Sequence, residues 1–394
     1  MSIADTEIRR AGESIADRAG ALRPVLERDR AAGDRQRRLT GDTVDALTGA
    51  GMFRLLVPRR FGGDEVGLRT AVDVAAELAH GDPAASWVVM ILGSADWITG
   101  LYPESAQREV YADGPDTRVC AVLTPHSTAR PVDGGWLLNG SWAPASGCLH
   151  AQWAIVGFPM SEKDGNGLAL VPMRQLRQDD TWFTAGMRGT GSNLLIGEDV
   201  FVPQRRVLPM KAAVAGEYAV DRPDLARYRS AFMPTLATYM IGPYLGMASA
   251  ALEYVTGQAG RRGISFTNYG RQSDSTAFQL VVAEAAAKVD AVRLLAHNAA
   301  DVVDGHAAGG TFPDYLTRAR IRLHTGYAVR QCREAVDALI SAYGASAMAE
   351  SNPLQAYMRD IHAASRHAVA NPAANAELFG RALLGVEPNI TELI

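Results

Sequence analysis

The pattern of apolar and polar residues predicts helices through about the first 111 residues. Residues 38–58, RLTGDTVDALTGAGMFRLLVP, have apolar positions at helical spacing, a candidate N-cap at Thr40 or Asp42, and a Gly-Met-Phe sequence where the helix should end. Residues 68–102 predict two helices, separated by the HGDP sequence at 80–83. The second of these is apolar almost all round, so we expect it to be buried.

The pattern changes near Arg118. From there, short apolar runs are separated by Gly, Pro, Asn and Asp, which is typical of strands and turns. These runs lie at 119–125, 134–146, 152–160, 167–173 and 193–203. The sequence VDGGW at 132–136 predicts a hairpin turn.

Helical spacing returns after about Pro223. Four long segments, at 236–259, 276–305, 313–344 and 352–370, predict an antiparallel helical bundle. The sequence therefore predicts an α+β multi-domain protein. We expect an N-terminal helical domain at 1–118, a central β domain at 119–215, and a C-terminal helical bundle at 216–394.

The composition narrows the class of protein. The 394-residue chain is 47% apolar and 21% charged, which is typical of a soluble globular protein. Its net charge is −4 and no Lys/Arg-rich run is present, so no nucleic-acid-binding surface is expected. No stretch approaches about 18 uninterrupted apolar residues, and the charged N-terminus lacks the apolar run of a secretory signal.

The cysteines carry no recognisable site. Cys120, Cys148 and Cys332 are far apart and form no C-x-x-C pair, so neither a disulfide framework nor a zinc site is predicted. We expect a cytoplasmic protein that binds no metal ion and does not associate with a membrane.

The first candidate site is a hairpin rich in tryptophan, at 134–157. Trp142 has the shape to pack on a flat heteroaromatic ring, and the Ser146 hydroxyl could reach the polar edge of that ring. Ordinary aromatic pairs across two strands would give the same pattern. The downstream loop GMRGTGSN could offer N–H and hydroxyl donors to a phosphate, but it matches neither a Walker loop nor a Rossmann fingerprint.

The second candidate site is the sequence MRDIHAASRHAV at 358–369. His362 and His367 are five residues apart, which on a helix separates them by roughly 140°, so they cannot share a metal ion. His367 would share a face with Ala363 and Ala364, whose small side chains leave space in front of the ring. A structural role for either histidine stays open on spacing alone. We interpret Arg359 and Asp360 as an ion pair that fastens the helix.

Four motifs, in this order along the chain, resemble the acyl-CoA dehydrogenase fold. They are GMFRLLVPRRFGGDEVGL at 51–68, VDGGWLLNGSWAPASG at 132–147, MRGTGSNLLIGEDVFVP at 187–203, and MRDIHAASRHAV at 358–369. The resemblance covers nearly the whole length of the chain. It implies a helical domain, a central β-barrel or sandwich domain, and a C-terminal four-helix bundle.

The chain departs from the dehydrogenases where their chemistry resides. Many of them carry Tyr-Glu-Gly shortly after an Arg-Asp pair, and the glutamate removes a substrate proton. Here that position falls on Ala368, which cannot act as a base. Their Thr-Glu-Pro-x-x-Gly-Ser-Asp motif is also missing, since residues 123–129 read LTPHSTA.

The sequence instead resembles the flavin-dependent monooxygenase branch of this fold, the oxygenase components of two-component aromatic hydroxylases. Their motifs are matched by the following residues: Gly140, Trp142, Ser146, Gly147, Trp153, Arg359, Asp360 and His367. The resemblance implies that a separate reductase supplies reduced FAD or FMN, and that O₂ then gives a flavin 4a-hydroperoxide. An aromatic substrate, which is phenolic, polycyclic or indolic, would be hydroxylated. A homotetramer is also implied.

The resemblance also implies residue roles. Ser146 would form a hydrogen bond to the flavin N5, and His367 would accept a proton from the substrate. Thr124 and Trp142 would face the isoalloxazine ring, and Thr190 and Ser192 would lie near the ribityl-phosphate side. The remaining phosphate contacts, across a subunit boundary, are expected from Arg262 and Gln279.

The substrate side is expected along the helix MILGSADWITG at 90–100, with Met90, Asp96 and Trp97 as candidate contacts. Phenol-oxidising members carry a histidine two residues before this tryptophan, whereas this chain has Ala95 there. That difference favours a larger polycyclic or indolic substrate over a small phenolic acid.

Three alternatives stay open. The first is a dehydrogenase whose base has moved to another helix, and the second is oxygenation at nitrogen or sulfur. The third is a flavin- or ligand-binding protein without catalytic activity.

Overall fold

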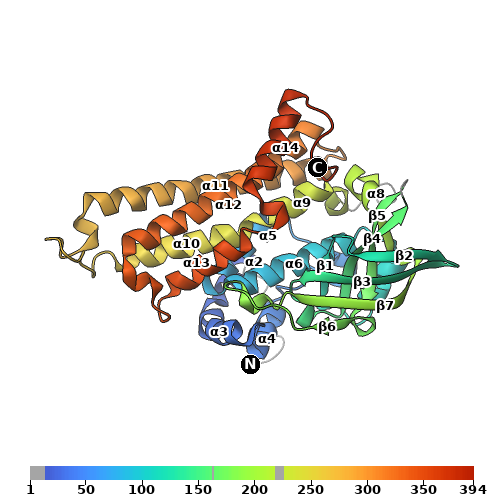
Figure 1. The fold of residues 1–394 in the computed structure, drawn as a ribbon, viewed down its shortest axis with the longest axis horizontal. Coiled ribbons are helices and arrows are strands. Elements are labelled where there is room, and N and C mark those ends of the chain that lie inside the picture. The colour runs from blue at the N-terminus through green and yellow to red at the C-terminus, as the bar shows by residue number, and fades with distance from the viewer. Residues whose placement is uncertain (1–13, 162–163, 218–225) are drawn as a thin grey trace.

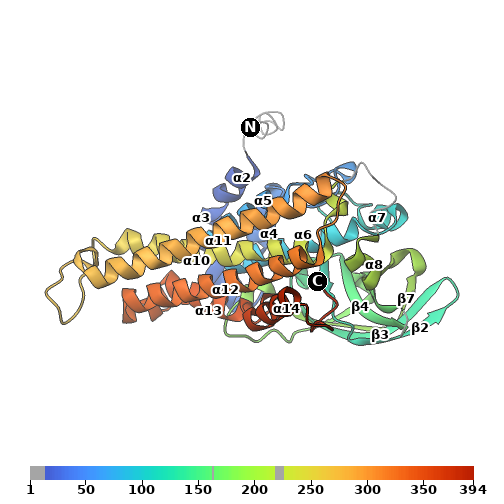
Figure 2. The ribbon, with the colours of Figure 1, turned by 90° about the horizontal axis from the view of Figure 1, so that it is seen from above.

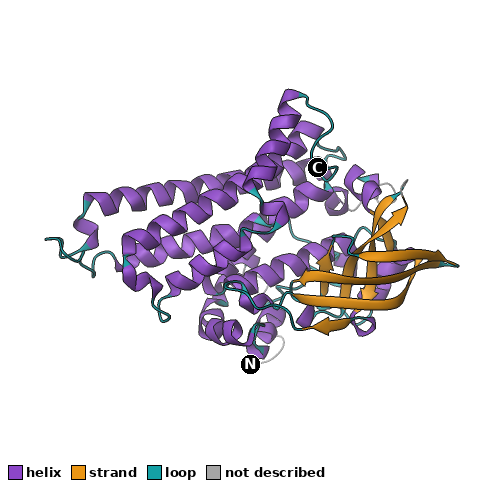
Figure 3. Cartoon of the chain, in the orientation of Figure 1, coloured by secondary structure: helices purple, strands orange, loops and turns teal. Residues whose placement is uncertain are grey.

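The structure is a computed structural model, and it describes residues 14–161, 164–217 and 226–394. Long helices occupy one side of the molecule and both β-sheets lie at the opposite end, with the N-terminal helices beside them (Figures 1 and 3). The expectation about a secretory signal concerns residues that fall partly outside the described part of the chain. No helix of the described residues is long and apolar enough to cross a membrane.

Helices precede the first strand, as the sequence pattern predicts. Thr40 is the N-cap of α4, where its hydroxyl accepts a hydrogen bond from the Thr43 N–H. The HGDP sequence separates α5 from α6, and Asp82 caps α6 through the Ala84 N–H. Nearly every residue of α6 is buried, which confirms that expectation. The bounds are α2 Ile15–Ala21, α3 Arg23–Gln36, α4 Gly41–Gly49, α5 Leu68–Gly81, α6 Pro83–Thr99 and α7 Glu104–Val110.

The described strands form two four-stranded sheets, in the orders β1-β4-β5-β8 and β2-β3-β7-β6. The predicted hairpin joins β2 to β3, with Val132 paired to Gly135 and Gly134 at positive φ in the turn. Strands β2, β6 and β8 were not predicted separately. The bounds are β1 Val119–Val122, β2 Ser127–Val132, β3 Gly135–Ala145, β4 Trp153–Ser161, β5 Gly165–Pro172, β6 Arg177–Asp179, β7 Asn193–Pro203 and β8 Val207–Pro209.

The C-terminal helices pack lengthwise against one another, and Figure 2 shows α13 alongside α12. The predicted helix at 236–259 is in fact two helices, which meet at Met240. Pro243 lacks an N–H and its ring would clash with the Tyr239 carbonyl of a continuous helix. The bounds are α8 Met210–Ala215, α9 Phe232–Tyr239, α10 Ile241–Gln258, α11 Thr276–Ala308, α12 Tyr315–Tyr343, α13 Pro353–Ala364 and α14 Pro372–Leu384.

One apolar core runs from the N-terminal helices through both sheets and into the bundle. Helix α5 packs on α10, and α6 contacts β1, so the N-terminal helices join the two other parts of the molecule. The α+β architecture is therefore the predicted one. The division at residues 118 and 215 stays a prediction.

Candidate active site

A cavity of about 200 Å³ lies where α6, the end of β3, the loop before β7, and the end of α13 meet. Its wall combines aromatic, hydroxyl and small apolar side chains with one histidine. The lining residues are Trp87, Pro144, Ser146, Trp182, Met187, Thr190, Ser192, Ala363, Ala364, Arg366 and His367. Four of the predicted site residues, namely Ser146, Thr190, Ser192 and His367, therefore share one cavity.

Three hydroxyl groups form a continuous chain on one wall of this cavity. The Ser146 and Ser192 Oγ atoms are 2.8 Å apart, and Ser192 Oγ lies 2.6 Å from Thr190 Oγ1. The chain ends at a backbone carbonyl, because Thr190 Oγ1 donates to the Met187 oxygen at 2.8 Å. At its other end, the Trp87 Nε1–H donates to Ser146 Oγ at 3.2 Å. All three hydroxyl-bearing residues are buried.

The turn at Met187 holds this chain in place. Met187 has a φ of 54°, in the left-handed region that non-glycine residues seldom adopt. Its N–H donates to Asp360 Oδ1 at 2.6 Å, and its carbonyl also accepts from the Trp182 indole N–H at 2.9 Å. The preceding Gly186 packs directly on α13, where a side-chain Cβ would lie 2.0 Å from the Arg359 oxygen. Fixed bonds on both sides of Met187 therefore stabilise an otherwise unfavourable backbone conformation.

Burial raises the pKa of Asp360 to about 7, against the opposing effect of its hydrogen bond from Met187. Asp82, the N-cap of α6, is also buried, and its pKa is raised to about 6 for the same reason. Charge repulsion from the Asp82 carboxylate also raises the pKa of Asp360. Two buried acids thus anchor the elements that carry Trp87 and Met187.

His367 lies three residues beyond the end of α13, so the predicted helical setting for this residue is wrong. The helix ends at Ala364, whose carbonyl accepts a hydrogen bond from the Tyr244 hydroxyl at 2.6 Å. His367 then adopts an extended conformation and caps a short 3-10 turn at Ala368–Ala370. The 140° separation from His362 therefore does not apply, although the two rings still point to different surroundings.

The His367 ring packs at an angle on Trp87, with 5.7 Å between ring centroids. Its Nδ1 accepts a hydrogen bond from the Val369 N–H at 3.3 Å. In the neutral ring the proton therefore resides on Nε2, which has no hydrogen-bond partner among the described residues. Burial lowers the pKa of His367 to about 4, so the ring is neutral at pH 7.

His362 is not part of the cavity. Its Nε2 lies 2.8 Å from Asp337 Oδ1 on α12, and its side chain is about two-fifths exposed, at 39%. The expected ion pair between Arg359 and Asp360 is also absent in this structure. Arg359 instead contacts Asp34 at 3.4 Å and donates to the Ala185 carbonyl, while Asp360 turns inward to Met187.

The structure does not bring Trp142 to the cavity. Its ring is fully buried between the sheets, and its Nε1 donates to the Gly157 carbonyl at 2.8 Å. Thr124 lies on the exposed loop between β1 and β2. The ordinary structural interpretation of Trp142 is thus the one that its surroundings favour.

Met90, Asp96 and Trp97 are also buried and outside the cavity lining. The Trp97 indole donates to the Arg227 carbonyl at 3.1 Å, and the Tyr111 hydroxyl donates to Asp96 Oδ1 at 3.3 Å. Burial raises the pKa of Asp96 well above its usual value. From α6 it is Trp87, one turn before Met90, that lines the cavity.

Arg262 lies in the connection between α10 and α11, and Gln279 lies in the first turn of α11. This connection is at the end of the bundle remote from the sheets (Figures 1 and 2). Arg262 stacks over Tyr343, with 4.0 Å to the ring centroid, and donates to Ser346 Oγ at 2.6 Å. Its Nε is buried without a hydrogen-bond partner among the described residues. Gln279 is exposed and donates to the Ser273 carbonyl. Within one chain, neither residue reaches the cavity.

Sequence reasoning missed several cavity residues, chiefly Trp87, Trp182 and Arg366. Trp87 belongs to the second of the two helices predicted within 68–102, but a helix that is apolar all round carries no sign of which side faces a site. Trp182 follows β6 in a stretch without regular pattern. Arg366 is an exposed charged residue, and its position next to His367 in the sequence was the one signal that it could line the cavity.

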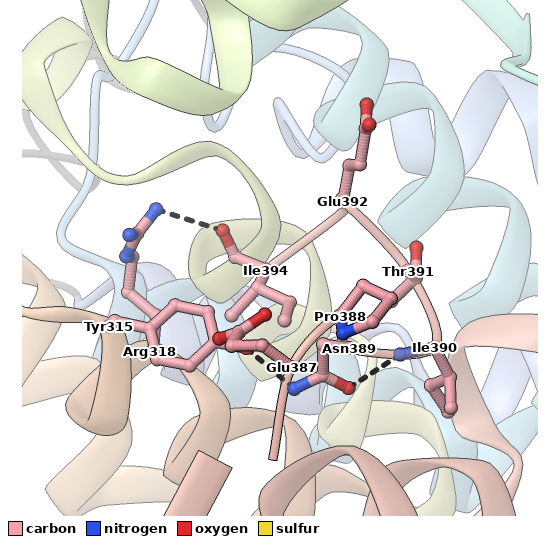
Figure 4. Close-up of a pocket in the computed structure, with 9 residues that line it drawn as sticks. All are labelled: Tyr315, Arg318, Glu387, Pro388, Asn389, Ile390, Thr391, Glu392 and Ile394. Carbon is pink, nitrogen blue, oxygen red and sulfur yellow. Dashed lines mark hydrogen bonds between the residues drawn. The ribbon is translucent and has the colours of Figure 1, made fainter. Parts of the chain in front are cut away.

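A second cavity, of about 450 Å³, lies between the C-terminal tail and α12 (Figure 4). In Figure 4, the Arg318 side chain donates to the Ile394 carbonyl oxygen, at 3.0 Å, and Asn389 donates to the Tyr315 hydroxyl, at 2.5 Å. None of the predicted site residues lines this cavity. Its walls lack a histidine or an aligned hydroxyl chain, so the smaller cavity is the stronger candidate.

Comparison with known proteins agrees with this fold. Residues 239–372 match the family described as acyl-CoA dehydrogenase, C-terminal domain. The chain is 35% identical over 393 residues to the oxygenase subunit HsaA of a flavin-dependent monooxygenase from Mycobacterium tuberculosis (strain ATCC 25618 / H37Rv), covering 97% of this chain and 98% of HsaA.

Two further relatives agree. The oxygenase component of FADH(2)-dependent resorcinol hydroxylase from Rhizobium sp. (strain MTP-10005) is 32% identical and is covered over 89% of each chain. The structure of XiaF from Streptomyces sp., in complex with FADH2 and glycerol, superimposes with a TM-score of 0.92 at 34% identity, covering 98% of each chain. The chain therefore belongs to the flavin-dependent monooxygenases with the acyl-CoA dehydrogenase fold, as an oxygenase subunit.

Proposed function

We propose that this protein hydroxylates an aromatic substrate, using O₂ and a reduced flavin that a separate reductase supplies. The balanced reaction takes one oxygen atom of O₂ into the product hydroxyl group and the other into water, with the two electrons coming from the flavin. The observation that carries the proposal is the cavity itself, which is lined by both a hydroxyl chain and a neutral histidine. Two relatives over 30% identical support it: HsaA is named as the oxygenase subunit of a flavin-dependent monooxygenase, and the other relative as the oxygenase component of an FADH(2)-dependent resorcinol hydroxylase.

The cavity residues fit a flavin. Ser146 Oγ has a lone pair left for a ring nitrogen after its bonds to Ser192 and Trp87. Trp87 and Trp182 present aromatic surfaces, and Ala363 and Ala364 occupy little space beside His367. When bound, reduced flavin supplies the electrons and activates O₂. The wall is largely apolar, which favours the low-water surroundings that such chemistry requires.

His367 is the proposed proton acceptor for a phenol hydroxyl or an indole N–H. Removing that proton makes the aromatic ring more electron-rich at the carbon to be hydroxylated. The neutral ring holds its proton on Nε2, so Nε2 cannot accept the substrate proton in this tautomer. It can do so only in the other tautomer, in which the ring proton is on Nδ1 and the hydrogen bond from the Val369 N–H is lost. The chemistry at His367 thus involves both ring nitrogens.

The remaining flavin contacts are proposed from a second subunit. Arg262 carries a buried Nε without a partner among the described residues and does not line the cavity of its own chain. Together with Gln279, it would bind flavin phosphate in a homotetramer, where the bundle end of one subunit meets the cavity of another. We place the enzyme in the cytoplasm, where Cys120, Cys148 and Cys332, all buried and unpaired, stay reduced.

The test supplies purified protein with FAD or FMN, a flavin reductase with NADH, air, and a panel of phenols, polycyclic phenols and indoles. Hydroxylated product and H₂O₂ are measured together. Product formed in proportion to the flavin oxidised, and lost in His367→Ala, supports the proposal. Release of all the oxidising equivalents as H₂O₂ with every substrate would refute it. Bleaching of a tightly bound oxidised flavin by an acyl thioester would instead indicate a dehydrogenase.

A further inference from the structure

The hydroxyl chain beside the cavity has a single direction. Thr190 Oγ1 can only donate to the Met187 carbonyl, because a carbonyl oxygen has no proton to give. With that proton committed, Ser192 must donate to Thr190, and Ser146 must in turn donate to Ser192. At the open end, the Trp87 indole N–H can only donate, so Ser146 Oγ accepts it.

The consequence concerns what Ser146 presents to a ligand. Its one proton points along the chain toward Ser192, and one of its two lone pairs accepts from Trp87. The lone pair that remains faces a ligand as an acceptor. A ligand atom in contact with Ser146 is therefore satisfied only if it donates a hydrogen bond.

Flavin changes its hydrogen-bonding character with its redox state at one ring position. N5 carries a hydrogen in reduced flavin and is a donor, whereas N5 of oxidised flavin has a lone pair and is an acceptor. An acceptor facing the Ser146 lone pair gains nothing, and turning the Ser146 proton toward it leaves Ser192 without its donor. The chain thus favours one redox state.

We propose that Ser192 and Thr190 are positioning residues, which hold the Ser146 proton away from the cavity so that Ser146 accepts the N5–H of reduced flavin and discriminates against oxidised flavin. This inference rests on the proposed function, because it takes the cavity to be the flavin site. Ser146 contacts the flavin N5, while Ser192 and Thr190, which also line the cavity, influence N5 through Ser146. Selection of the reduced state lets oxidised flavin leave after each reaction cycle.

Asp360 completes this arrangement from outside the cavity. Its bond to the Met187 N–H, together with the Trp182 bond to the Met187 carbonyl, fixes the direction in which that carbonyl points. This carbonyl is the last acceptor of the hydroxyl chain, so its position decides in which direction the Thr190, Ser192 and Ser146 hydroxyl groups donate.

The test measures anaerobic dissociation constants of FAD and FMN, each in the reduced and the oxidised state, with the whole protein. Wild type is expected to bind reduced flavin more tightly. In Ser192→Ala the Ser146 proton is free to turn toward N5, so oxidised flavin should bind more tightly than it does to wild type. The dissociation constant of oxidised flavin divided by that of reduced flavin should therefore fall about tenfold, the factor that corresponds to about one hydrogen bond. That fall equals about 30 mV in the midpoint potential of the bound flavin.

Thr190 provides a matched pair of variants. Thr190→Val removes the hydroxyl at nearly constant shape, so the ratio should fall as in Ser192→Ala. Thr190→Ser keeps the donor to Met187 and should keep the ratio of wild type. Thr235→Val is the control, since Thr235 is a buried threonine whose hydroxyl bonds only within its own helix, to the Ala231 carbonyl.

The outcomes separate the two proposals. Unchanged ratios in both Ser192→Ala and Thr190→Val would overturn the inference while leaving the flavin site intact. Equal losses in Thr190→Val and Thr190→Ser would also overturn it, because packing would then account for both. Failure of wild type to bind flavin in either state would instead contradict the proposed function. A gain in affinity for oxidised flavin is the supporting result, and mere structural damage does not produce such a gain.

Discussion

Asp360 Oδ1 accepts a hydrogen bond from the Met187 backbone N–H at 2.6 Å, between two residues 173 positions apart in the sequence. This contact ties α13, the helix that leads to His367, to the turn that ends the hydroxyl chain. Both partners are buried, so neither has access to solvent as a substitute. One carboxyl group therefore couples the two opposite walls of the cavity.

Two replacements of Asp360 should distinguish the role of its oxygen as a hydrogen-bond acceptor from the role of its charge. Asp360→Ala leaves the buried Met187 N–H without an acceptor, which should cost about 1–3 kcal/mol of unfolding free energy and weaken flavin binding. Asp360→Asn keeps an oxygen in the same place and should retain both properties. Thermal unfolding and flavin titration measure the two effects. Equal behaviour of the two variants would show that the hydrogen bond to Met187 is unimportant.

The pKa of Asp360 predicts how the stability of Asp360→Asn should vary with pH. The pKa is raised by burial, from 3.8 to about 7, so the folded wild type holds a proton that the unfolded chain releases. The stability gained from this group is fully present below about pH 4 and is lost as pH rises toward 7. The asparagine of the variant does not titrate, so only wild type loses this stability between about pH 4 and pH 7. The unfolding free energy of the variant minus that of wild type should therefore rise by at most about 1.4 kcal/mol per pH unit in this range and level off above it. Chemical denaturation at several pH values measures this difference, and a difference independent of pH would contradict a raised pKa.

His367→Ala should lose product formation by about a hundredfold or more, the usual contribution of a positioned proton acceptor. This variant leaves the proposed contact between the Ser146 hydroxyl and the flavin unchanged, so reduced flavin should still bind and be oxidised by O₂, with H₂O₂ as the product. His362→Ala is the matched control, because His362 lies outside the cavity and pairs with Asp337. Full coupling of flavin oxidation to product in His367→Ala would remove His367 from the mechanism.

The pH dependence of product formation offers a separate check on His367. Burial lowers its pKa to about 4, and a proton acceptor must be neutral to work. The rate of the hydroxylation step should therefore be constant from pH 8 to about pH 5 and decline only as pH falls through about 4. Single-turnover measurements with preloaded reduced flavin report this step. A decline centred near 6.5 would show that the ring is solvated like an ordinary histidine.

Gly186, in the loop before β7, is predicted to tolerate no side chain. A Cβ there would lie 2.0 Å from the Arg359 oxygen on α13, so Gly186→Ala must displace the Met187 turn or the helix. We expect a loss of about 1–3 kcal/mol in unfolding free energy, together with weaker flavin binding. Gly257→Ala is the control, since Gly257 is exposed on α10 with open space around it, and this change should stabilise the helix by up to about 1 kcal/mol. Unfolding by urea measures both variants, and an unaffected Gly186→Ala would rule out the close approach.

The local elements were predictable because their signals are local. The Thr40 cap, the break at Asp82 and the turn at Gly134 each depend on the chemistry of a few neighbouring residues. The grouping of Ser146, Thr190, Ser192 and His367 was predictable in a different way, through motifs that resemble a known family. Neither spacing nor composition would have brought these four residues together.

The positions of Trp142 and of Met90, Asp96 and Trp97 on α6, outside the cavity lining, have physical causes. A regular strand would place Trp142 and Ser146, four residues apart, on the same face. The register between β3 and β7 shifts between Trp142 and Ala145, so Trp142 enters the core while Ser146 reaches the cavity. On α6, burial on all sides removes the polar face that would have indicated which turn lines the site.

By itself, the sequence determined the order of helices and strands, the absence of a dehydrogenase glutamate at Ala368, and the presence of a histidine beside it. The tertiary structure decided where α13 ends and what His367 contacts. No glycine or proline follows α13 until Pro372, so local sequence gives no reason to stop at Ala364. The Ala364 carbonyl at the end of the helix accepts hydrogen bonds from the Tyr244 hydroxyl, which belongs to another helix, and from the His367 N–H. Beyond this point the chain places the His367 ring against Trp87.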